Sequence, residues 1–178
     1  MVIERNKYLQ ELVSCRHNGL VKIITGMRRC GKSFLLFRLF RRFLEDNGVA
    51  NDHIVEMAFD DYAFKEFRNP DKFYAYVKGR IIDDQPYYIL LDEVQMLDEF
   101  EDVLNGLLHI PNADLYVTGS NAKFLSKDII TEFRGRGYQI HVSPLSFAEF
   151  MSIYEGDRED GWNEYLLYGG LPPVVLLK

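Results

Sequence analysis

A glycine-rich octapeptide, GMRRCGKS at residues 26–33, carries the residue types that bind phosphate. Its two glycines, followed by Lys32 and Ser33, match the pattern G-x-x-x-x-G-K-[ST]. In such a loop the backbone N–H groups face the anion, the lysine reaches the β- and γ-phosphates, and the hydroxyl binds Mg²⁺. The alternative is a plain turn between a strand and a helix. The residues predicted to bind ATP are Gly26, Met27, Arg28, Arg29, Cys30, Gly31, Lys32, Ser33 and Phe34.

An acidic pair, Asp92 and Glu93, follows the apolar run YYILL. An aspartate at the end of a buried strand is placed to bind Mg²⁺ together with Ser33. The adjacent glutamate could position or deprotonate a water that attacks the γ-phosphate. Alone, such a pair also fits a solvated strand end. Because it follows a glycine–lysine loop, it predicts Asp92 as a metal ligand and Glu93 as a catalytic residue, and it disfavours a kinase.

Two further polar segments adjoin predicted strands. Ser120 and Asn121 end the run DLYVTGSN, and Asn121 is predicted to contact the γ-phosphate or the attacking water. The alternative is a Gly-Ser-Asn turn. Arg134 and Arg136 precede the last predicted strand, where an arginine could stabilise the transferring phosphoryl group in cis or from a neighbouring subunit. The alternative is a pair of surface arginines.

Strands and helices must position these residues. Apolar, β-branched runs predict five strands, at residues 20–25, 53–59, 87–93, 114–120 and 138–143. Helical patterns alternate with them, and the first helix runs from the glycine loop to a stop at Gly48. Helix starts are marked by Asn69 before a proline and by two capping-box spacings, Asp98 with Glu101 and Ser146 with Glu149. The order predicts an α/β fold with a mostly parallel sheet covered on both faces.

Composition restricts the class of protein. The 178 residues are 47% hydrophobic and 27% charged, which is typical of a globular domain. No apolar run approaches the ~20 residues that a membrane span needs. The net charge of −6 argues against a surface built wholly for nucleic acid. With only Cys15 and Cys30, no disulfide framework is expected, which suits a cytoplasmic location. Cys30 is interpreted as a tolerated small residue rather than a redox switch.

The C-terminal stretch differs from the rest. GDREDG at residues 156–161 is polar and bounded by glycines, which predicts a linker or exposed turn. The apolar run YLLYGGLPPVVLLK then follows. We therefore expect a nucleotide-binding core at 1–155, and a linker with the start of a truncated C-terminal region at 156–178. A further domain is expected to begin near Trp162.

Five segments together resemble one family: ITGMRRCGKS, ILLDEVQ, VTGSNAKFLS, RGRGYQIHVSPLSFAEF and YGGLPP. On these, the chain resembles the AAA-type P-loop ATPases of bacteria and archaea, and within them a subgroup with a C-terminal domain of unknown function. The resemblance implies a three-layer P-loop NTPase sandwich with five strands in the order 5-1-4-3-2. It places Asn121 at the sensor position, favours Arg136 over Arg134 as an arginine finger, and puts residues 3–9 near the adenine.

The resemblance also bears on the two loop arginines and on the end of the chain. Arg28 and Arg29 recur in the subgroup, where they would add positive charge at the phosphates or pair with nearby carboxylates. AAA-type ATPases usually have a helical lid after the core, and this chain stops before a whole lid.

The expected function is Mg²⁺-dependent ATP binding and hydrolysis, coupled to a C-terminal domain or a partner. The alternative is a slowly hydrolysing, nucleotide-dependent switch or scaffold. ATP and Mg²⁺ are the expected cofactors. The expected partners are further copies of the chain, through Arg136, and a nucleic-acid or protein client that the sequence does not identify. No membrane partner is expected.

Overall fold

A single parallel sheet organises the molecule. The computed structural model describes residues 2–119, 133 and 135–176. The strands are β1 (Val21–Thr25), β2 (Ile54–Ala58), β3 (Tyr87–Asp92), β4 (Ala113–Thr118) and β5 (Gly137–His141). Their order is β2-β3-β4-β1-β5, and each neighbouring pair is parallel. The predicted α/β fold and the strand order 5-1-4-3-2 are confirmed.

Helices connect the strands. The α-helices are α1 (Asn6–Ser14), α2 (Lys32–Phe34), α3 (Arg41–Asp46), α4 (Pro70–Arg80), α5 (Phe100–Leu107), α8 (Phe147–Met151), α9 (Arg158–Tyr168) and α10 (Pro172–Leu176). A π-helix, η1 (Leu35–Phe40), joins α2 to α3, so a helical segment runs from the glycine loop to Asp46. The 3₁₀ helices are η2 (Asn51–His53), η3 (Tyr62–Arg68) and η4 (Val94–Met96).

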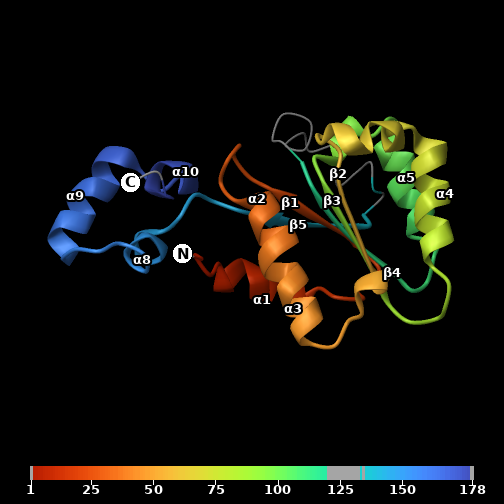
Figure 1. The fold of residues 1–178 in the computed structure, drawn as a ribbon, viewed down its shortest axis with the longest axis horizontal. Helices are drawn as coiled ribbons and strands as arrows, with labels where there is room; N and C mark the ends of the chain where they lie inside the picture. The colour runs from red at the N-terminus through yellow and green to blue at the C-terminus, as the bar shows by residue number, and fades with distance from the viewer. Residues whose placement is uncertain (1, 120–132, 134, 177–178) are drawn as a thin grey trace.

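Two apolar clusters hold the helices on the sheet. Alternate residues of a strand face opposite sides, so Ile23 and Ile24 of β1 belong to different clusters. Ile24 packs in the cluster that contains Phe40 of η1. Ile23 packs in the cluster that contains Phe73 of α4 and Leu104 of α5. Figure 1 shows the resulting three layers, with α1, α2 and α3 on one face of the sheet and α4 and α5 on the other.

One predicted helix start is wrong. The sequence suggested a capping box between Asp98 and Glu101, but α5 begins at Phe100. Its N-cap, Glu99, has a left-handed backbone (φ +52°) and no side-chain cap hydrogen bond. Spacing alone cannot reveal this geometry, because the backbone entering α5 also depends on η4 and the loop before it. The expected capping box at Ser146 and Glu149 is present.

The C-terminal helices extend beyond the three layers. Asp157 caps α9 by accepting the backbone N–H groups of Glu159 and Asp160, both at 2.9 Å, so most of the expected linker is helical. Phe147 of α8 and Trp162 of α9 pack edge to face, with ring centroids 4.9 Å apart. Figure 1 shows α8, α9 and α10 on one side, beyond the N-terminal segment. The division of the chain near residue 155 stays a prediction.

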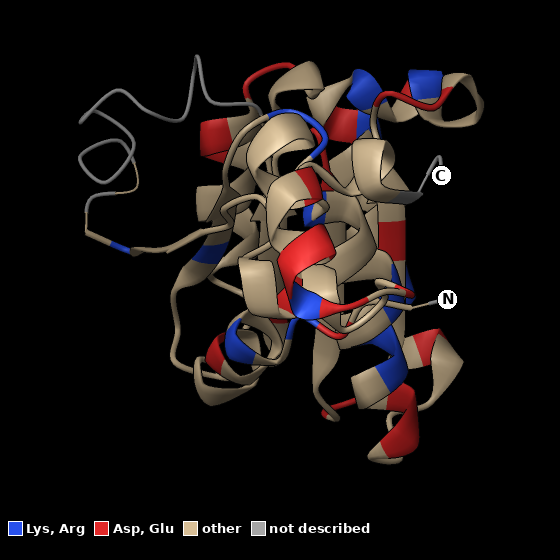
Figure 2. Cartoon of the chain, turned by 90° about the vertical axis from the view of Figure 1, so that its left-hand side faces the viewer, with Lys and Arg blue, Asp and Glu red and all other residues tan. Residues whose placement is uncertain are grey.

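The described residues can also be examined for the distribution of charge and for helices that could span a membrane. Basic and acidic residues are interspersed on the side that Figure 2 shows, consistent with a surface that is not uniformly basic. No helix among the described residues is long and apolar enough to cross a membrane.

Candidate nucleotide-binding site

A cavity of about 320 Å³ opens where the carboxyl end of β1 meets the N-terminal segment and α10. Parallel strands bring their carboxyl ends to one edge of a sheet, which is where open α/β sheets bind ligands. Both polar and apolar side chains line the cavity. The lining residues are Ile3, Arg5, Arg28, Arg29, Gly31, Lys32, Ser33, Phe34, Glu93, Leu145, Pro172 and Pro173.

Glycine is required at both ends of the loop that borders this cavity. Gly26 has a φ of +145°, and a Cβ there would lie 2.1 Å from the carbonyl oxygen of Val142. Gly31 has a φ of +98° and forms the N-cap of the helical segment. Glycine adopts such angles without the steric cost of a side chain. The loop therefore enters and leaves through conformations that larger residues resist.

Lys32 lies at the mouth of this loop and is only 5% exposed. Its Nζ donates hydrogen bonds to the carbonyl oxygens of Gly26, at 3.2 Å, and Met27, at 3.1 Å. The ammonium group thus lies across the loop, with its remaining donor capacity free for an anion. The loop, the lysine and the start of α2 together offer positive charge and backbone donors on one side of the cavity.

Asp92 ends β3 and is 5% exposed. The Thr118 hydroxyl donates a hydrogen bond to its carboxylate, and the Ser33 hydroxyl lies close enough to influence its pKa. Burial raises the pKa of Asp92, the two hydroxyl groups lower it, and the nearby charges of Glu93 and Asp60 raise it, with a net upward shift. Ser33 and Asp92, which the sequence paired as metal ligands, are therefore neighbours in the structure.

Glu93 lines the cavity in a left-handed backbone conformation, with a φ of +51°. This conformation is uncommon outside glycine, and such residues gather at functional sites. Its backbone N–H donates to the Thr118 hydroxyl at 3.1 Å, and the side-chain amide of Gln95 donates to its carboxylate. Thr118 thus orients both members of the acidic pair.

Sequence reasoning did not single out Thr118. A signal was present, because Thr118 ends the strand next to β3 and β3 ends in Asp92. The register pairs Leu91 with Val117, so the following residues, Asp92 and Thr118, lie side by side.

The two loop arginines line the cavity and are exposed. Among the described residues, neither Arg28 nor Arg29 forms an ion pair with a carboxylate, which favours the first of the two predicted roles, positive charge at the phosphates. Cys30 is fully buried, and burial raises the pKa of its thiol, although Lys32 and Arg5 oppose this. A buried thiol with a raised pKa is unreactive, in keeping with a packing role. Met27 is exposed beside the cavity.

The remaining predicted residues lie elsewhere. Arg136 is exposed and precedes β5, whose first residue pairs with Val21 at the start of β1. It therefore lies at the opposite end of the sheet from its own glycine loop, and it does not line the cavity. A role in cis is inconsistent with this position. Ser120, Asn121 and Arg134 lie outside the described residues.

Together, the parallel sheet with a glycine loop after β1 and an acidic pair after β3 define the P-loop NTPase fold. Residues 18–151 match the AAA domain family, and the chain belongs to that family. An uncharacterized protein of Haemophilus influenzae is 33% identical to this chain in an alignment that covers 98% of the chain. The same alignment covers 45% of the Haemophilus protein. The chain therefore covers less than half the length of this relative.

Solved structures show the same fold. The structure of the S. cerevisiae Hsp104–ADP complex aligns with 99% of this chain and with 30% of the Hsp104 chain. The TM-score is 0.69 and the sequence identity is 17%. The structure of the Aeropyrum pernix ORC1 protein in complex with DNA aligns with 92% of this chain and with 50% of the ORC1 chain. The TM-score is 0.56 and the sequence identity is 14%. At these identities the likeness concerns the fold alone.

Proposed function

We propose that the chain binds ATP with Mg²⁺ and hydrolyses it. The observation that carries this proposal is a single cavity in which Lys32, Ser33 and Glu93 face apolar residues, with Asp92 behind Ser33. Membership of the AAA domain family also supports nucleotide binding. The phosphates would lie against the loop amides and Lys32. The base would pack against apolar lining residues of the cavity, which include Ile3, Leu145, Pro172 and Pro173.

The donor set fits magnesium. Mg²⁺ prefers oxygen ligands and is usually held by one or two protein groups together with substrate phosphates. Ser33 and Asp92 would supply a neighbouring hydroxyl and carboxylate. The described residues contain no group of three or more His, Cys, Asp or Glu side chains that could hold a metal ion alone, so this two-residue arrangement needs the phosphates to complete it. When bound, Mg²⁺ would neutralise charge on the phosphate oxygens.

Glu93 is the proposed general base. Glu93 lines the cavity and its backbone N–H donates to the Thr118 hydroxyl, so its carboxylate would orient a water and accept its proton. Hydrolysis would then proceed with Lys32 balancing charge on the β- and γ-phosphates.

One contact favours the second candidate, a slowly hydrolysing nucleotide-dependent switch. Gln95 donates a hydrogen bond to the Glu93 carboxylate. While this bond persists, one carboxylate oxygen is occupied and the base is less able to accept a proton. Turnover with and without added DNA, RNA or protein separates the candidates, because a switch stays slow until a client frees Glu93.

Assembly and the whole protein are further proposals. Arg136 is exposed and distant from its own cavity, so it could reach the site of a second copy of the chain. The fold neighbours include a protein solved with DNA and one solved with casein, and the client of this chain is proposed to be a nucleic acid or a protein. A C-terminal domain coupled to the core is proposed from the resemblance of the sequence.

The experiment that tests the function is calorimetric titration of Mg²⁺-ATP into the wild type and Lys32→Ala, followed by a phosphate-release assay on Glu93→Gln. The proposal expects binding by the wild type, severe loss in Lys32→Ala, and hydrolysis lowered at least ~10²-fold in Glu93→Gln with affinity retained. Equal affinity in the wild type and Lys32→Ala would overturn it.

A further inference from the structure

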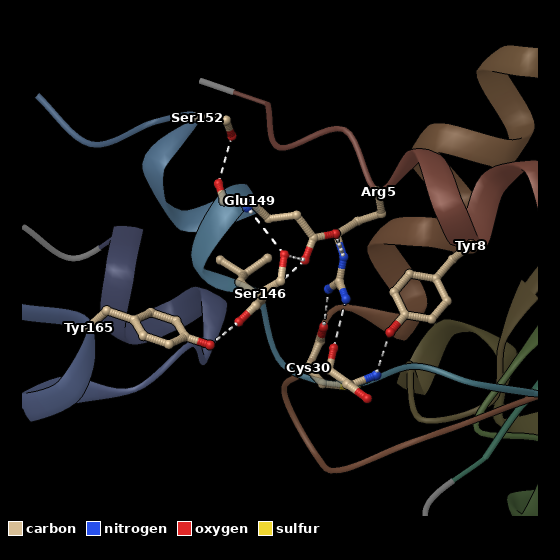
Figure 3. A network of polar contacts seen from close by, with 9 residues as sticks. Arg5, Tyr8, Cys30, Ser146, Glu149, Ser152 and Tyr165 are labelled. Atoms are coloured by element: carbon tan, nitrogen blue, oxygen red, sulfur yellow. Dashed lines mark hydrogen bonds and ion pairs between the residues drawn. The ribbon is translucent and has the colours of Figure 1, made fainter. Parts of the chain in front are cut away.

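Arg5 is an arginine that neither the sequence patterns nor the proposed chemistry uses, yet it is 3% exposed and lines the nucleotide cavity. Its guanidinium stands over the ring of Tyr8, with Cζ 4.8 Å from the centroid. Nη1 donates to the carbonyl oxygen of Cys30 at 3.1 Å, and Nη2 donates to the carbonyl oxygen of Ser143 at 2.7 Å. Figure 3 shows this group reaching from the N-terminal segment toward the loop.

The contact with Cys30 fixes the orientation of one peptide group in the glycine loop. In a trans peptide the C=O and the following N–H point in opposite directions. Because the Cys30 carbonyl points at Arg5, the N–H of Gly31 points away from it. A phosphate loop works only when its N–H groups are turned inward together, since these are the donors that hold the anion. Rotation of the Cys30–Gly31 peptide would place a carbonyl oxygen where a donor is needed.

The other side of Arg5 is held by an acidic residue of α8. Nε lies 2.8 Å from Oε1 of Glu149. The second carboxylate oxygen, Oε2, accepts the backbone N–H of Ser146 at 2.7 Å and the Ser146 hydroxyl at 3.1 Å. The Glu149 backbone N–H donates in return to the Ser146 hydroxyl at 3.3 Å, which completes the capping box of α8. The carboxylate is therefore already fixed by its own helix when it meets the guanidinium. Opposite charges this close attract strongly where water is largely excluded, so the ion pair holds Arg5 and α8 together.

We propose that Arg5 is a positioning residue for the phosphate loop. It keeps the Gly31 N–H turned toward the phosphates and, through Glu149, makes this orientation depend on the position of α8. The inference rests on the nucleotide site proposed above. It adds that α8, which lies outside the glycine loop and the acidic pair, controls how well the loop binds phosphate. Tyr165 of α9 extends the connection by donating from its hydroxyl to the carbonyl of Leu145 at 2.7 Å.

The test measures Mg²⁺-ATP affinity and apo-protein melting for Arg5→Met, Glu149→Gln and a control, Arg41→Met. Arg41 also forms an arginine–glutamate pair, with Glu56, but it does not line the cavity. Methionine retains most of the apolar stem, and glutamine retains the capping interaction while removing the charge. We expect the dissociation constant to rise about tenfold to about a hundredfold in Arg5→Met, to rise less in Glu149→Gln, and to stay within about twofold in Arg41→Met.

A spectroscopic readout separates positioning from loss of stability. The amide ¹⁵N–¹H resonance of Gly31 should move on ATP saturation in the wild type. In Arg5→Met it should start from a different position and fail to reach the wild-type bound position. A resonance that matches the wild type in both states, or an unchanged dissociation constant in folded Arg5→Met, would overturn the inference.

Three outcomes lead to separate conclusions. If Arg5→Met does not fold, Arg5→Lys and Glu149→Gln take its place. Weakened ATP binding by either folded variant supports the inference, and unchanged binding by both overturns it. If the wild type itself does not bind Mg²⁺-ATP, the proposed function fails and the inference fails with it. If the wild type binds and Arg5→Met binds equally well, only the inference fails.

Discussion

Two buried aspartates lie at opposite ends of the parallel sheet, and they differ in how their charge is compensated. Asp114, near the start of β4, forms an ion pair with Lys22, which is itself fully buried. It also accepts the Tyr116 hydroxyl at 2.9 Å and the backbone N–H of His17 at 3.1 Å. Asp92, at the end of β3, accepts a hydrogen bond from the Thr118 hydroxyl and has the Ser33 hydroxyl nearby, and no described Lys, Arg or His side chain forms an ion pair with it.

The difference separates a structural carboxylate from one that is available to a ligand. A buried charge is costly unless it is paired. The fold supplies a cation for Asp114 from the neighbouring strand β1, and no such cation for Asp92, whose pKa burial raises. We infer that the counter-ion of Asp92 arrives from outside with the nucleotide. Substitutions that alter one of the two aspartate sites and leave the other intact test this difference.

The largest effect is expected from Lys22→Met. The change leaves Asp114 as a buried charge without its cation, and it should lower the free energy of unfolding by about 3–5 kcal/mol. Urea denaturation followed by circular dichroism measures this. Arg41→Met, which breaks a partly exposed pair with Glu56, is the control and should cost no more than about 1 kcal/mol. Equal losses in the two variants would mean that burial does not distinguish these pairs.

Asp92→Asn should act in the opposite direction in the metal-free protein. Removing an uncompensated buried charge should raise the free energy of unfolding by about 0.5–2 kcal/mol, as often happens when a functional group is replaced. Asp114→Asn is the matched control, and it should destabilise because it leaves Lys22 unpaired. The same urea experiment in the presence of EDTA measures both. Destabilisation by Asp92→Asn as large as by Asp114→Asn would contradict the distinction between the two sites.

The pH dependence of this gain is a smaller effect. Because the pKa of Asp92 is raised in the folded state, protonation of its carboxyl stabilises the folded state relative to the unfolded state. This contribution to the free energy of unfolding is fully present below the unfolded pKa of about 3.9 and is lost as pH rises through the folded pKa. The advantage of Asp92→Asn over the wild type should therefore be smallest near about pH 4 and grow as pH rises. Unfolding measured in EDTA across this range gives the difference. A difference that shrinks with rising pH would have the wrong sign.

Much of the fold could be predicted from the sequence because local patterns determine it. The strand before Asp92 is a continuous apolar run, the other strands are rich in apolar residues, and the glycine loop lies between a strand and a helix, so strand number and parallel pairing followed. The strand order came from family resemblance. The helix α1 was not predicted, although its apolar residues Tyr8, Leu9, Leu12 and Val13 recur at helical spacing. Most of the polar stretch at 156–161 proved helical because Asp157 caps α9.

The residues of the candidate site also fall into two groups, those that a local sequence motif indicates and those that it does not. Lys32, Ser33, Asp92 and Glu93 lie in short motifs whose chemistry can be read directly, and the structure brings them together. Arg5 acts across the fold on residues far along the chain, so no local spacing indicates it. Its partners become visible only when the N-terminal segment, the loop and α8 are packed. Long-range polar contacts of this kind are a property of the tertiary structure.

The most direct test of the central claim is the magnesium dependence of ATP affinity, measured by titration with Mg²⁺ and with EDTA in the wild type, Asp92→Asn and Asp60→Asn. Asp60→Asn controls for the loss of a nearby acidic charge. The account predicts that Mg²⁺ tightens binding at least about tenfold in the wild type and in Asp60→Asn, and that Asp92→Asn binds ATP equally with and without it. A full magnesium effect in Asp92→Asn would contradict the claim that Asp92 is reserved for an external cation.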